Sequence, residues 1–292
     1  MKIQEIWPGP MEGIGRNGFI RAATGLRLVE RWMTPFIRVT GSVPAAGKLF
    51  RMVEEYLSGV VPVTIQIMGN DPEALGECAA KLLAFPHVEG INLNCGCPSL
   101  RVVRHHSGGG MLRHPEKLAE FCRKIAVFLP PEKLSVKVRS GFENPDDMEI
   151  FLPELSESGV ISKIFFHYRT VTEMYSSSPL PERVNRIARA VKLCGDVPVI
   201  ANGDISSVSD GESLVAATGA AGIMIARPWM RDPFLLRRFH DNLTADEETG
   251  RQLFMAELRR EGIRGGALIE LAKMLWGSKS EHFRQIMAEE GY

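Results

Sequence analysis

The sequence predicts an α/β fold, a (β/α)8 or TIM barrel with a small C-terminal helical domain. Three observations lead to this prediction. Short apolar runs rich in β-branched residues alternate with amphipathic stretches along most of the 292 residues. These runs are apolar on both faces, as expected of parallel strands covered by helices. After residue 240 the helical patterns continue but no further strand pattern follows.

Eight runs are predicted to be strands. Six carry clear patterns, at residues 62–68, 90–94, 134–139, 164–167, 197–201 and 221–225. Residues 3–8 and 32–39 carry weaker patterns and complete the set.

Helices are predicted between the strands, where Pro, Asp or Ser marks the start of an amphipathic stretch. They span residues 71–83, 115–128, 146–156, 181–193 and 207–217. A repeated strand–helix unit produces a parallel sheet with right-handed crossovers. An open, doubly wound sheet is the alternative, but eight units exceed the usual number of strands in such a sheet and favour a closed barrel.

The C-terminal segment is predicted to be purely helical, with helices at 245–262, 267–276 and 281–290. We therefore expect a barrel domain over residues 1–240 and a helical appendage over residues 241–292.

The composition is that of an ordinary globular protein, with 45% hydrophobic and 24% charged residues. Lys+Arg and Asp+Glu are balanced at 35 each, so any polyanionic partner has to meet a local patch of charge. Five cysteines form no regular disulfide pattern, and neither a signal peptide nor a membrane span is apparent. A cytoplasmic location is expected.

Polar residues follow the predicted strands at their C-terminal ends, where barrel enzymes carry their active sites. The residues concerned include Asn94 and Cys97, Lys137 and Arg139, His167, and Asn202 to Asp204. An inward-facing Lys137 on an apolar strand is costly unless an anion or an electron-rich ring compensates its charge. A capped turn is the alternative for each site taken singly.

The last two strand ends predict a phosphate site. Gly203 permits close approach of the backbone, Ser206 or Ser207 can begin the next helix, and Arg227 adds a charged fork. Barrels commonly hold a phosphate at the loops after strands 7 and 8.

The chain resembles the tRNA-dihydrouridine synthases. The resemblance rests on NCGCP at 94–98, the glycine run at 108–110, VKVR at 136–139, HYRT at 167–170 and PVIANGDI at 198–205. It covers roughly the first 240 residues and implies an FMN-binding barrel.

The resemblance also implies residue roles. It assigns FMN contacts to Pro10, Met11, Glu12, Gln66, Lys137, His167, Asn202, Gly203, Asp204, Ala226 and Arg227. Cys97 would be the catalytic proton donor, and Asn94, Arg139 and Arg169 would contact the substrate. No metal is implied; a site built from Cys95, His105 and His106 matches no usual zinc spacing.

The implied reaction is reduction of the C5=C6 bond of a uridine in the tRNA D-loop. NADPH or NADH reduces the flavin, N5 delivers hydride to C6, and Cys97 protonates C5. A thiol with an ordinary pKa of about 8.5 is protonated at neutral pH and still able to release its proton. The alternative for Cys97 is a small buried core residue.

The glycine run is expected in a mobile loop that carries or covers Cys97, with a plain connector as the alternative. Two basic groups are candidates for tRNA phosphates. One is the barrel mouth, with Arg101, Arg104, His105, His106, Arg139 and Arg169; the other is the appendage, with Arg259, Arg260, Arg264, Lys273, Lys279 and Arg284. Interleaved acidic residues leave a solvated helix face as the alternative for the appendage.

The chain departs from the pattern of the family in four places. Gly13 to Arg16 stand where an Asp or Thr-Asp is common, Tyr168 replaces a glycine, and Ala226 replaces the glycine before Arg227. Arg104 to His106 add a residue to the catalytic loop. Residues 11–13 and 36–39 resemble most the bacterial branch that modifies position 16, and a monomer is expected. Two rival functions remain: a flavin enzyme of a free small molecule such as a pyrimidine, and a non-catalytic tRNA-binding protein.

Overall fold

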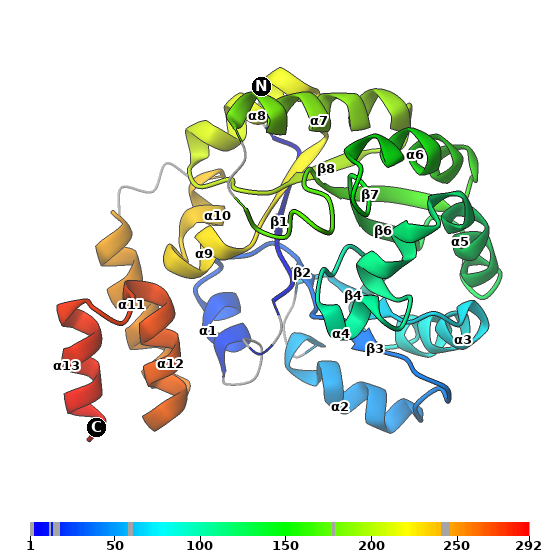
Figure 1. The fold of residues 1–292 in the computed structure, drawn as a ribbon. Coiled ribbons are helices and arrows are strands. Elements are labelled where there is room, and N and C mark those ends of the chain that lie inside the picture. The colour runs from blue at the N-terminus through cyan, green and yellow to red at the C-terminus, as the bar shows by residue number, and fades with distance from the viewer. Residues whose placement is uncertain are drawn as a thin grey trace.

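A computed structural model describes residues 3–11, 13, 18–57, 61–176, 179–240 and 246–291. The chain folds as a parallel barrel surrounded by helices (Figure 1). The strands are β1 (Glu5–Pro8), β2 (Trp32–Met33), β3 (Ile37–Arg38), β4 (Val63–Met68), β5 (Val88–Cys95), β6 (Leu134–Arg139), β7 (Ile161–His167), β8 (Val199–Asn202) and β9 (Gly222–Ile225). Their order is β1-β9-β8-β7-β6-β5-β4-β2, and β3 also pairs with β4.

The predicted barrel is confirmed, with one strand divided. Residues 32–39 were expected to form one strand, but β2 and β3 pair with β4 separately. Pro35 has no backbone N–H to give to a ladder, and Thr34 Oγ1 accepts the bond from Gln66 N at 3.1 Å instead. Together β2 and β3 occupy one position in an eight-membered barrel.

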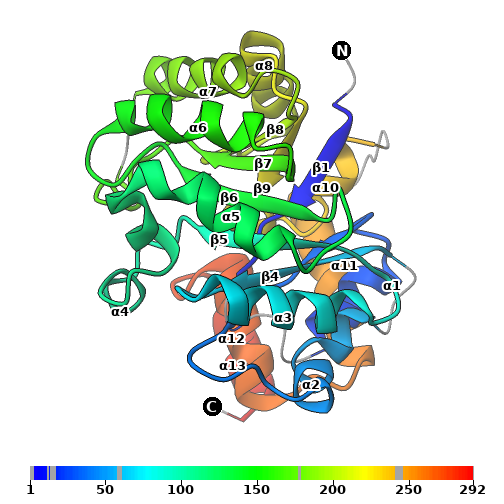
Figure 2. The same cartoon turned by 90° about the vertical axis from the view of Figure 1, so that its right-hand side faces the viewer.

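The helices lie on the outside of the barrel (Figure 2). They are α1 (Phe19–Gly25), α2 (Ala46–Leu57), α3 (Pro72–Leu83), α4 (Leu100–Val103), α5 (Leu118–Ala126), α6 (Met148–Glu157), α7 (Leu180–Cys194), α8 (Val208–Thr218), α9 (Arg227–Arg231) and α10 (Leu235–Arg238). Short 3-10 turns are η1 (Gly108–Arg113), η2 (Pro115–Lys117) and η3 (Pro145–Asp147).

The predicted start signals act as helix caps. Asp71 Oδ1 accepts from Ala74 N at 3.1 Å at the start of α3, and Ser207 Oγ accepts from Asp210 N at 3.1 Å at the start of α8. Sequence reasoning missed α1, α2 and the short helices α4, α9 and α10. For α2 the signal was present, because its buried residues Leu49, Val53, Tyr56 and Leu57 repeat at helical spacing.

Three more helices follow the barrel: α11 (Glu247–Arg260), α12 (Gly265–Trp276) and α13 (Glu281–Glu289). They lie beside α1 and α9 (Figure 1). The Phe19 ring packs edge-on against Phe254 of α11 and Trp229 of α9, with ring centroids 5.1 and 5.5 Å apart. The core between sheet and helices therefore continues into the C-terminal helices. Among the described residues, no helix is long and apolar enough to cross a membrane.

The barrel interior is apolar on the side of β1, β2 and β7 to β9, and polar at the end where the strands terminate. On the side of β4 to β6 it holds a buried hydrogen-bonded chain of Gln66, Asn92 and Ser135. Trp7, Met33, Phe165, Ile200 and Met224 form a buried cluster inside the barrel. Because side chains alternate along a strand, the next inward positions toward the C-terminal ends fall on Lys137, His167 and Asn202. This apolar cluster therefore lies beneath the three polar side chains inside the barrel.

Close packing of α3 against Phe128, in the segment that follows α5, depends on Gly76. A Cβ at this position would lie 2.2 Å from the Phe128 ring. We expect Gly76→Ala to destabilise the fold by about 1–3 kcal/mol through overpacking. The matched control is Gly47→Ala in α2, where a Cβ meets only a side-chain atom of Arg51 at 4.0 Å. That change should leave stability equal or raise it by up to about 1 kcal/mol. Urea unfolding of both variants tests the pair, and equal stabilities would contradict this account.

Candidate active site

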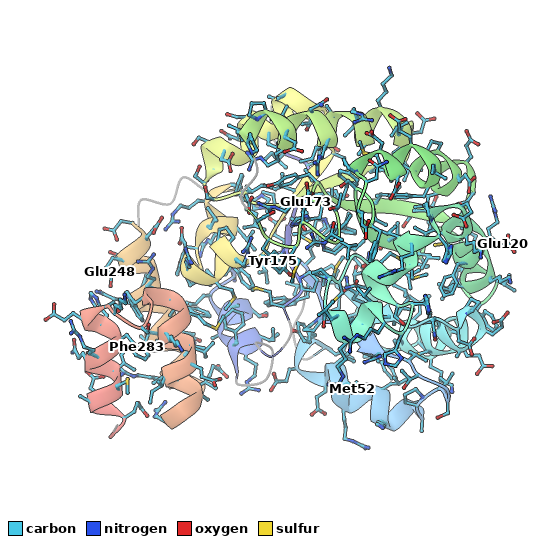
Figure 3. All side chains as sticks on the ribbon, in the orientation of Figure 1. Met52, Glu120, Glu173, Tyr175, Glu248 and Phe283 are labelled. Carbon is cyan, nitrogen blue, oxygen red and sulfur yellow. The ribbon has the colours of Figure 1, made fainter. Side chains whose placement is uncertain are left out.

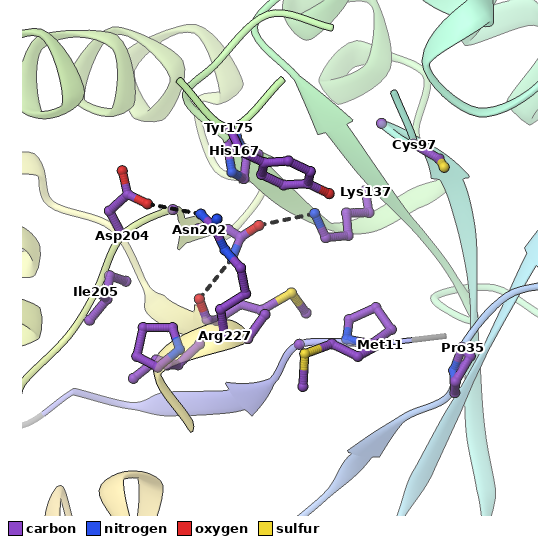
Figure 4. Close-up of a pocket in the computed structure, with 18 of the residues that line it drawn as sticks. Met11, Pro35, Cys97, Lys137, His167, Tyr175, Asn202, Asp204, Ile205 and Arg227 are labelled. Atoms are coloured by element: carbon purple, nitrogen blue, oxygen red, sulfur yellow. Dashed lines mark hydrogen bonds and ion pairs between the residues drawn. The ribbon is translucent and has the colours of Figure 1, made fainter. Parts of the chain in front are cut away.

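A cavity of about 780 Å³ opens at the C-terminal ends of the strands (Figure 4). Residues from the ends of β1, β4, β5, β6, β7, β8 and β9 line it. Of the residues predicted from the sequence, Pro10, Met11, Gln66, Asn94, Cys97, Lys137, Arg139, His167, Asn202, Gly203, Asp204, Ala226 and Arg227 contribute to its walls. Glu12 lies outside the described residues, and Arg169 is buried and does not line the cavity. The fold thus brings together nearly all of the predicted site.

Lys137 places a cation inside the cavity. Its Nζ donates to Asn202 Oδ1 at 3.0 Å, and Asn202 Nδ2 donates to Met224 O at 2.8 Å. Burial, and then the nearby Arg139, lower the pKa of the Lys137 ammonium to about 7. No carboxylate pairs with it in the part of the chain that the structure describes. The ammonium therefore favours an electron-rich ligand beside it.

His167 is a neutral hydrogen-bond donor. Burial, followed by the charges of Arg139 and Lys137, holds the pKa of His167 well below its usual range. Its Nδ1 accepts from the backbone N–H of Arg169 at 3.3 Å. The single imidazole proton therefore resides on Nε2, which is free to donate to a ligand.

Asp204 is the centre of the network behind the predicted phosphate loop. Its carboxylate accepts from Tyr168 Oη at 2.8 Å, from Arg169 Nη2, and from Arg227 Nη2 at 3.3 Å. Burial raises the pKa of Asp204, but the bonds from Arg169 and Tyr168 outweigh it and hold the pKa below its usual range. A carboxylate repels a phosphate, so any contact of Asp204 with one has to come from its backbone N–H.

Gly203 and Tyr168 are matched to one another. Gly203 has a φ of 121°, and a Cβ there would lie 2.7 Å from the Tyr168 ring. Tyr168 is buried and stacks on His167, with ring centroids 5.5 Å apart at 4°. Tyr168 stands where the family has a glycine. It fits here because Gly203 leaves room for its ring and Asp204 accepts a hydrogen bond from its hydroxyl group.

Asn94 positions the Cys97 loop. Its Oδ1 accepts from Gly96 N at 3.1 Å and from Cys97 N at 3.0 Å, and its Nδ2 donates to Gln66 Oε1 at 2.8 Å. Gln66 Nε2 donates in turn to Asn92 Oδ1 at 2.8 Å. Contacts of Gln66 with a flavin and of Asn94 with a uracil stay predictions; in this structure both side chains order the loop.

The glycine run covers Cys97, as one of the sequence-based expectations had it. Gly109 N donates to Cys97 O at 3.0 Å, and a Cβ on Gly108 would lie 3.1 Å from Cys97 Cβ. Residues 108–110 are buried in η1. Only glycine allows this approach, so the run shapes the wall beside the thiol; mobility of the loop stays a prediction.

The two arginines expected to meet substrate are buried within the protein. Arg139 Nε donates to Gly96 O at 2.9 Å, and its Nη1 donates to Thr170 O and Met174 O, both at 2.8 Å. Arg169 is 1% exposed and donates to Ser176 O at 2.6 Å in addition to Asp204. Both guanidinium groups thus anchor the loop after β7 in this structure, and their contact with substrate stays a prediction.

Sequence reasoning missed part of the wall. Tyr175 lies over the cavity next to His167 and Lys137 and is 54% exposed (Figure 4). Arg227 stacks on its ring, 4.7 Å from the centroid. Phe36 and, from α11, Glu247 and Arg251 complete the lining. No strand-end rule points to these positions, because a long loop or a distant segment carries them.

Among the described residues, no group of three His, Cys, Asp or Glu side chains could hold a metal ion.

Comparison with known proteins identifies the family. The sequence model of the family described as dihydrouridine synthase (Dus) matches residues 9–261. The chain belongs to the dihydrouridine synthase family. A tRNA-dihydrouridine(16) synthase of Cupriavidus necator is 34% identical over 256 residues, which are 84% of this chain and 77% of the relative. The protein of the same name from Ralstonia nicotianae is 32% identical over 80% of this chain and 72% of its own.

The barrel is also similar to a solved structure of more distant sequence. A variant of NCR from Zymomonas mobilis superposes with a TM-score of 0.57 at 13% identity, over 83% of this chain and 88% of that one. At this identity the similarity concerns the fold alone. This similarity agrees with the barrel fold described above for this member of the dihydrouridine synthase family.

The buried Lys137 makes stability depend on pH. Its ammonium is disfavoured in the folded state, so the cost is fully present below about pH 7. The cost declines as pH rises, because the folded protein then releases a proton that the unfolded chain still holds. We expect Lys137→Met to stabilise the flavin-free protein at pH 6 and to lose this advantage by pH 10.

Urea unfolding across this pH range measures the difference. Lys124→Met on the exposed face of α5 is the control and should show no such dependence. A Lys137→Met advantage that is constant with pH would contradict the assignment of a depressed pKa to Lys137.

Proposed function

We propose that this protein is a tRNA-dihydrouridine synthase that uses FMN and NADPH, or NADH, to reduce the C5=C6 bond of a uridine in the tRNA D-loop. The observation that carries the proposal is the pairing of Cys97 with Lys137 across one cavity (Figure 4). A positioned thiol on one side and an unpaired cation on the other suit reduction of an electron-poor ring. The names of the relatives support the same activity.

The residues present fit FMN. The Lys137 ammonium lacks an anionic partner among the described residues, and a flavin ring that gains negative charge would supply one. At the end of the cavity formed by β8 and β9, the Gly203 backbone lines the wall without a side chain, and the Arg227 side chain is 57% exposed. Pro10, Met11 and Gln66 would border the ring, and Asn202, Ala226 and the Asp204 N–H would complete the phosphate end. When bound, FMN supplies the two electrons of the reduction.

The protein side of the reaction is proton transfer and orientation. Cys97 Sγ would give its proton to C5 of the uracil, with Asn94 holding the backbone of residues 96 and 97 so that the thiol keeps its place. His167 Nε2 would donate to an electron-rich oxygen in the cavity. A cofactor and a base that fill the cavity would exclude water from it and so strengthen both interactions.

The proposal also covers which uridine is reduced, and the oligomeric state, location and domain division of the enzyme. Relatives named for position 16 support that uridine as the target. The proposal includes a monomeric, cytoplasmic enzyme, and a division into a barrel over residues 1–240 and a tRNA-recognising helical appendage over residues 241–292.

Cys97→Ala tests the acid. The variant should keep its yellow flavin and its oxidation of NADPH, because it removes only the proton donor. It should form dihydrouridine on unmodified tRNA at least about 100-fold more slowly. Position-resolved mapping of dihydrouridine, with Cys194→Ala on α7 as control, measures this. Full activity would exclude Cys97 as the acid. Turnover of free uracil in place of tRNA would favour a small-molecule oxidoreductase.

Arg227→Ala tests the phosphate end. Removal of a charge-assisted hydrogen bond should weaken FMN binding by about 1.5–3 kcal/mol. Fluorescence titration of the flavin-free protein measures the dissociation constant. Arg123→Ala on α5 is the control, because its guanidinium lies outside the cavity. Equal affinity in the Arg227 variant would move the phosphate to another part of the site.

A further inference from the structure

A second cavity lies on the other side of Cys97. It encloses about 950 Å³ between α2, the β2–β3 segment and α4. Pro35, Phe36 and Cys97 line both cavities, so the two meet along this wall. The volume falls within the range of small-molecule sites, about 300–1,000 Å³. Neither FMN nor the target uracil, as proposed above, accounts for this space.

Three arginines line the second cavity: Arg38, Arg51 and Arg101. Across the described part of the chain, no ion pair joins any of them to a carboxylate. Arg38 Nε is buried and has no hydrogen-bond partner there. Two acids also line the cavity, Glu54 and Glu55, and Glu55 lies 3.6 Å from Arg21. A positive balance thus remains inside the cavity.

Part of the other candidate basic patch differs in this respect. In the C-terminal helices, where the sequence offered a second basic patch, Arg259 pairs with Glu289 and Arg260 with Glu257, each at 2.5 Å. The first pair joins α11 to α13 and the second lies within α11, so both guanidinium groups have a carboxylate partner. The chain carries no net charge overall, so cations left without carboxylates mark the surface that attracts an anion.

We propose that the second cavity binds the nucleotide next to the target uridine in the tRNA strand. This inference rests on the proposed function. Arg51 and Arg101 would hold the phosphate that links the two nucleotides, and the neighbouring base would pack against Phe36 on the face away from the flavin. Single-stranded RNA is recognised in this way, through stacking on aromatic rings and phosphate contacts with arginine.

The surroundings of the cavity favour RNA over the adenosine half of the reductant. Exposed apolar side chains flank it, with Met52 50% and Leu100 70% exposed. Figure 3 shows Met52 on α2, and Tyr175 nearer the centre of the barrel. Exposed basic residues continue outward from α4, at Arg104, His105 and His106. A charged and apolar surface that extends beyond one nucleotide suits a strand rather than a single small molecule.

The test uses flavin-loaded protein and unmodified tRNA. We expect the double variant Arg51→Gln/Arg101→Gln to bind tRNA about tenfold more weakly. The slope of log K against log salt should fall by roughly 0.7 for each phosphate that the protein no longer neutralises. Arg123→Gln on α5 should bind tRNA as the unaltered protein does. Filter binding at several salt concentrations gives both quantities.

A second arm locates the contact on the RNA. A neutral methylphosphonate replaces, one at a time, the phosphates on either side of the target uridine. One replacement should weaken binding by the unaltered protein and have no further effect on the double variant. Independent, additive decreases in affinity would overturn the proposal. So would unchanged tRNA affinity with a raised KM for NADPH, which would assign the cavity to the reductant.

These results stand apart from the proposed function. If the unaltered protein binds tRNA but forms no dihydrouridine, the proposed activity fails, and the binding arms still decide whether the cavity holds a nucleotide.

Discussion

The structure of the site depends on one constraint, a lysine ammonium placed inside a barrel without a carboxylate to balance it. Lys137 is inward-facing on β6, above a floor of apolar side chains. Its neighbours are a neutral amide, Asn202, a second cation, Arg139, and a histidine that stays neutral. None of these neighbours carries a negative charge, so the Lys137 ammonium remains available to a ligand. A carboxylate in place of Asn202 would pair with the ammonium and leave less of its charge for a ligand.

The remaining buried cations are used to fix loops. Arg139 bridges the Cys97 loop and the loop after β7, since its donors reach Gly96 O, Thr170 O and Met174 O. Arg169 joins the same loop to Asp204 beyond β8. The loops that carry Cys97 and Asp204 are thereby tied through guanidinium groups to one framework. Rigid placement of reacting groups in this way contributes strongly to rate, because small displacements are costly.

Much of the fold and the site followed from the sequence, for reasons that are local. Strands such as β9, at residues 222–225, were found because buried parallel strands are continuously apolar, and α3 because Asp71 caps it. Site residues at strand ends followed from the geometry of parallel barrels. The break at Pro35 was missed because a side-chain acceptor, Thr34 Oγ1, sustains the pairing across it. Tyr175 and Arg251 were missed because tertiary packing alone brings them to the cavity.

A chain with no net charge can bind a polyanion if its charges are distributed unequally. Here most described arginines on the helices are matched by acids close by, as with Arg186, which pairs with Glu173 at 2.7 Å, and Arg189, which pairs with Asp146 at 2.8 Å. Beside Cys97, Arg38, Arg51 and Arg101 line a cavity and form no ion pair with any carboxylate that the structure describes. An anion is attracted to such a local excess of positive charge even when the chain as a whole is neutral. The proposed binding of an RNA strand beside Cys97 therefore depends on this local imbalance of charge rather than on the overall charge of the chain.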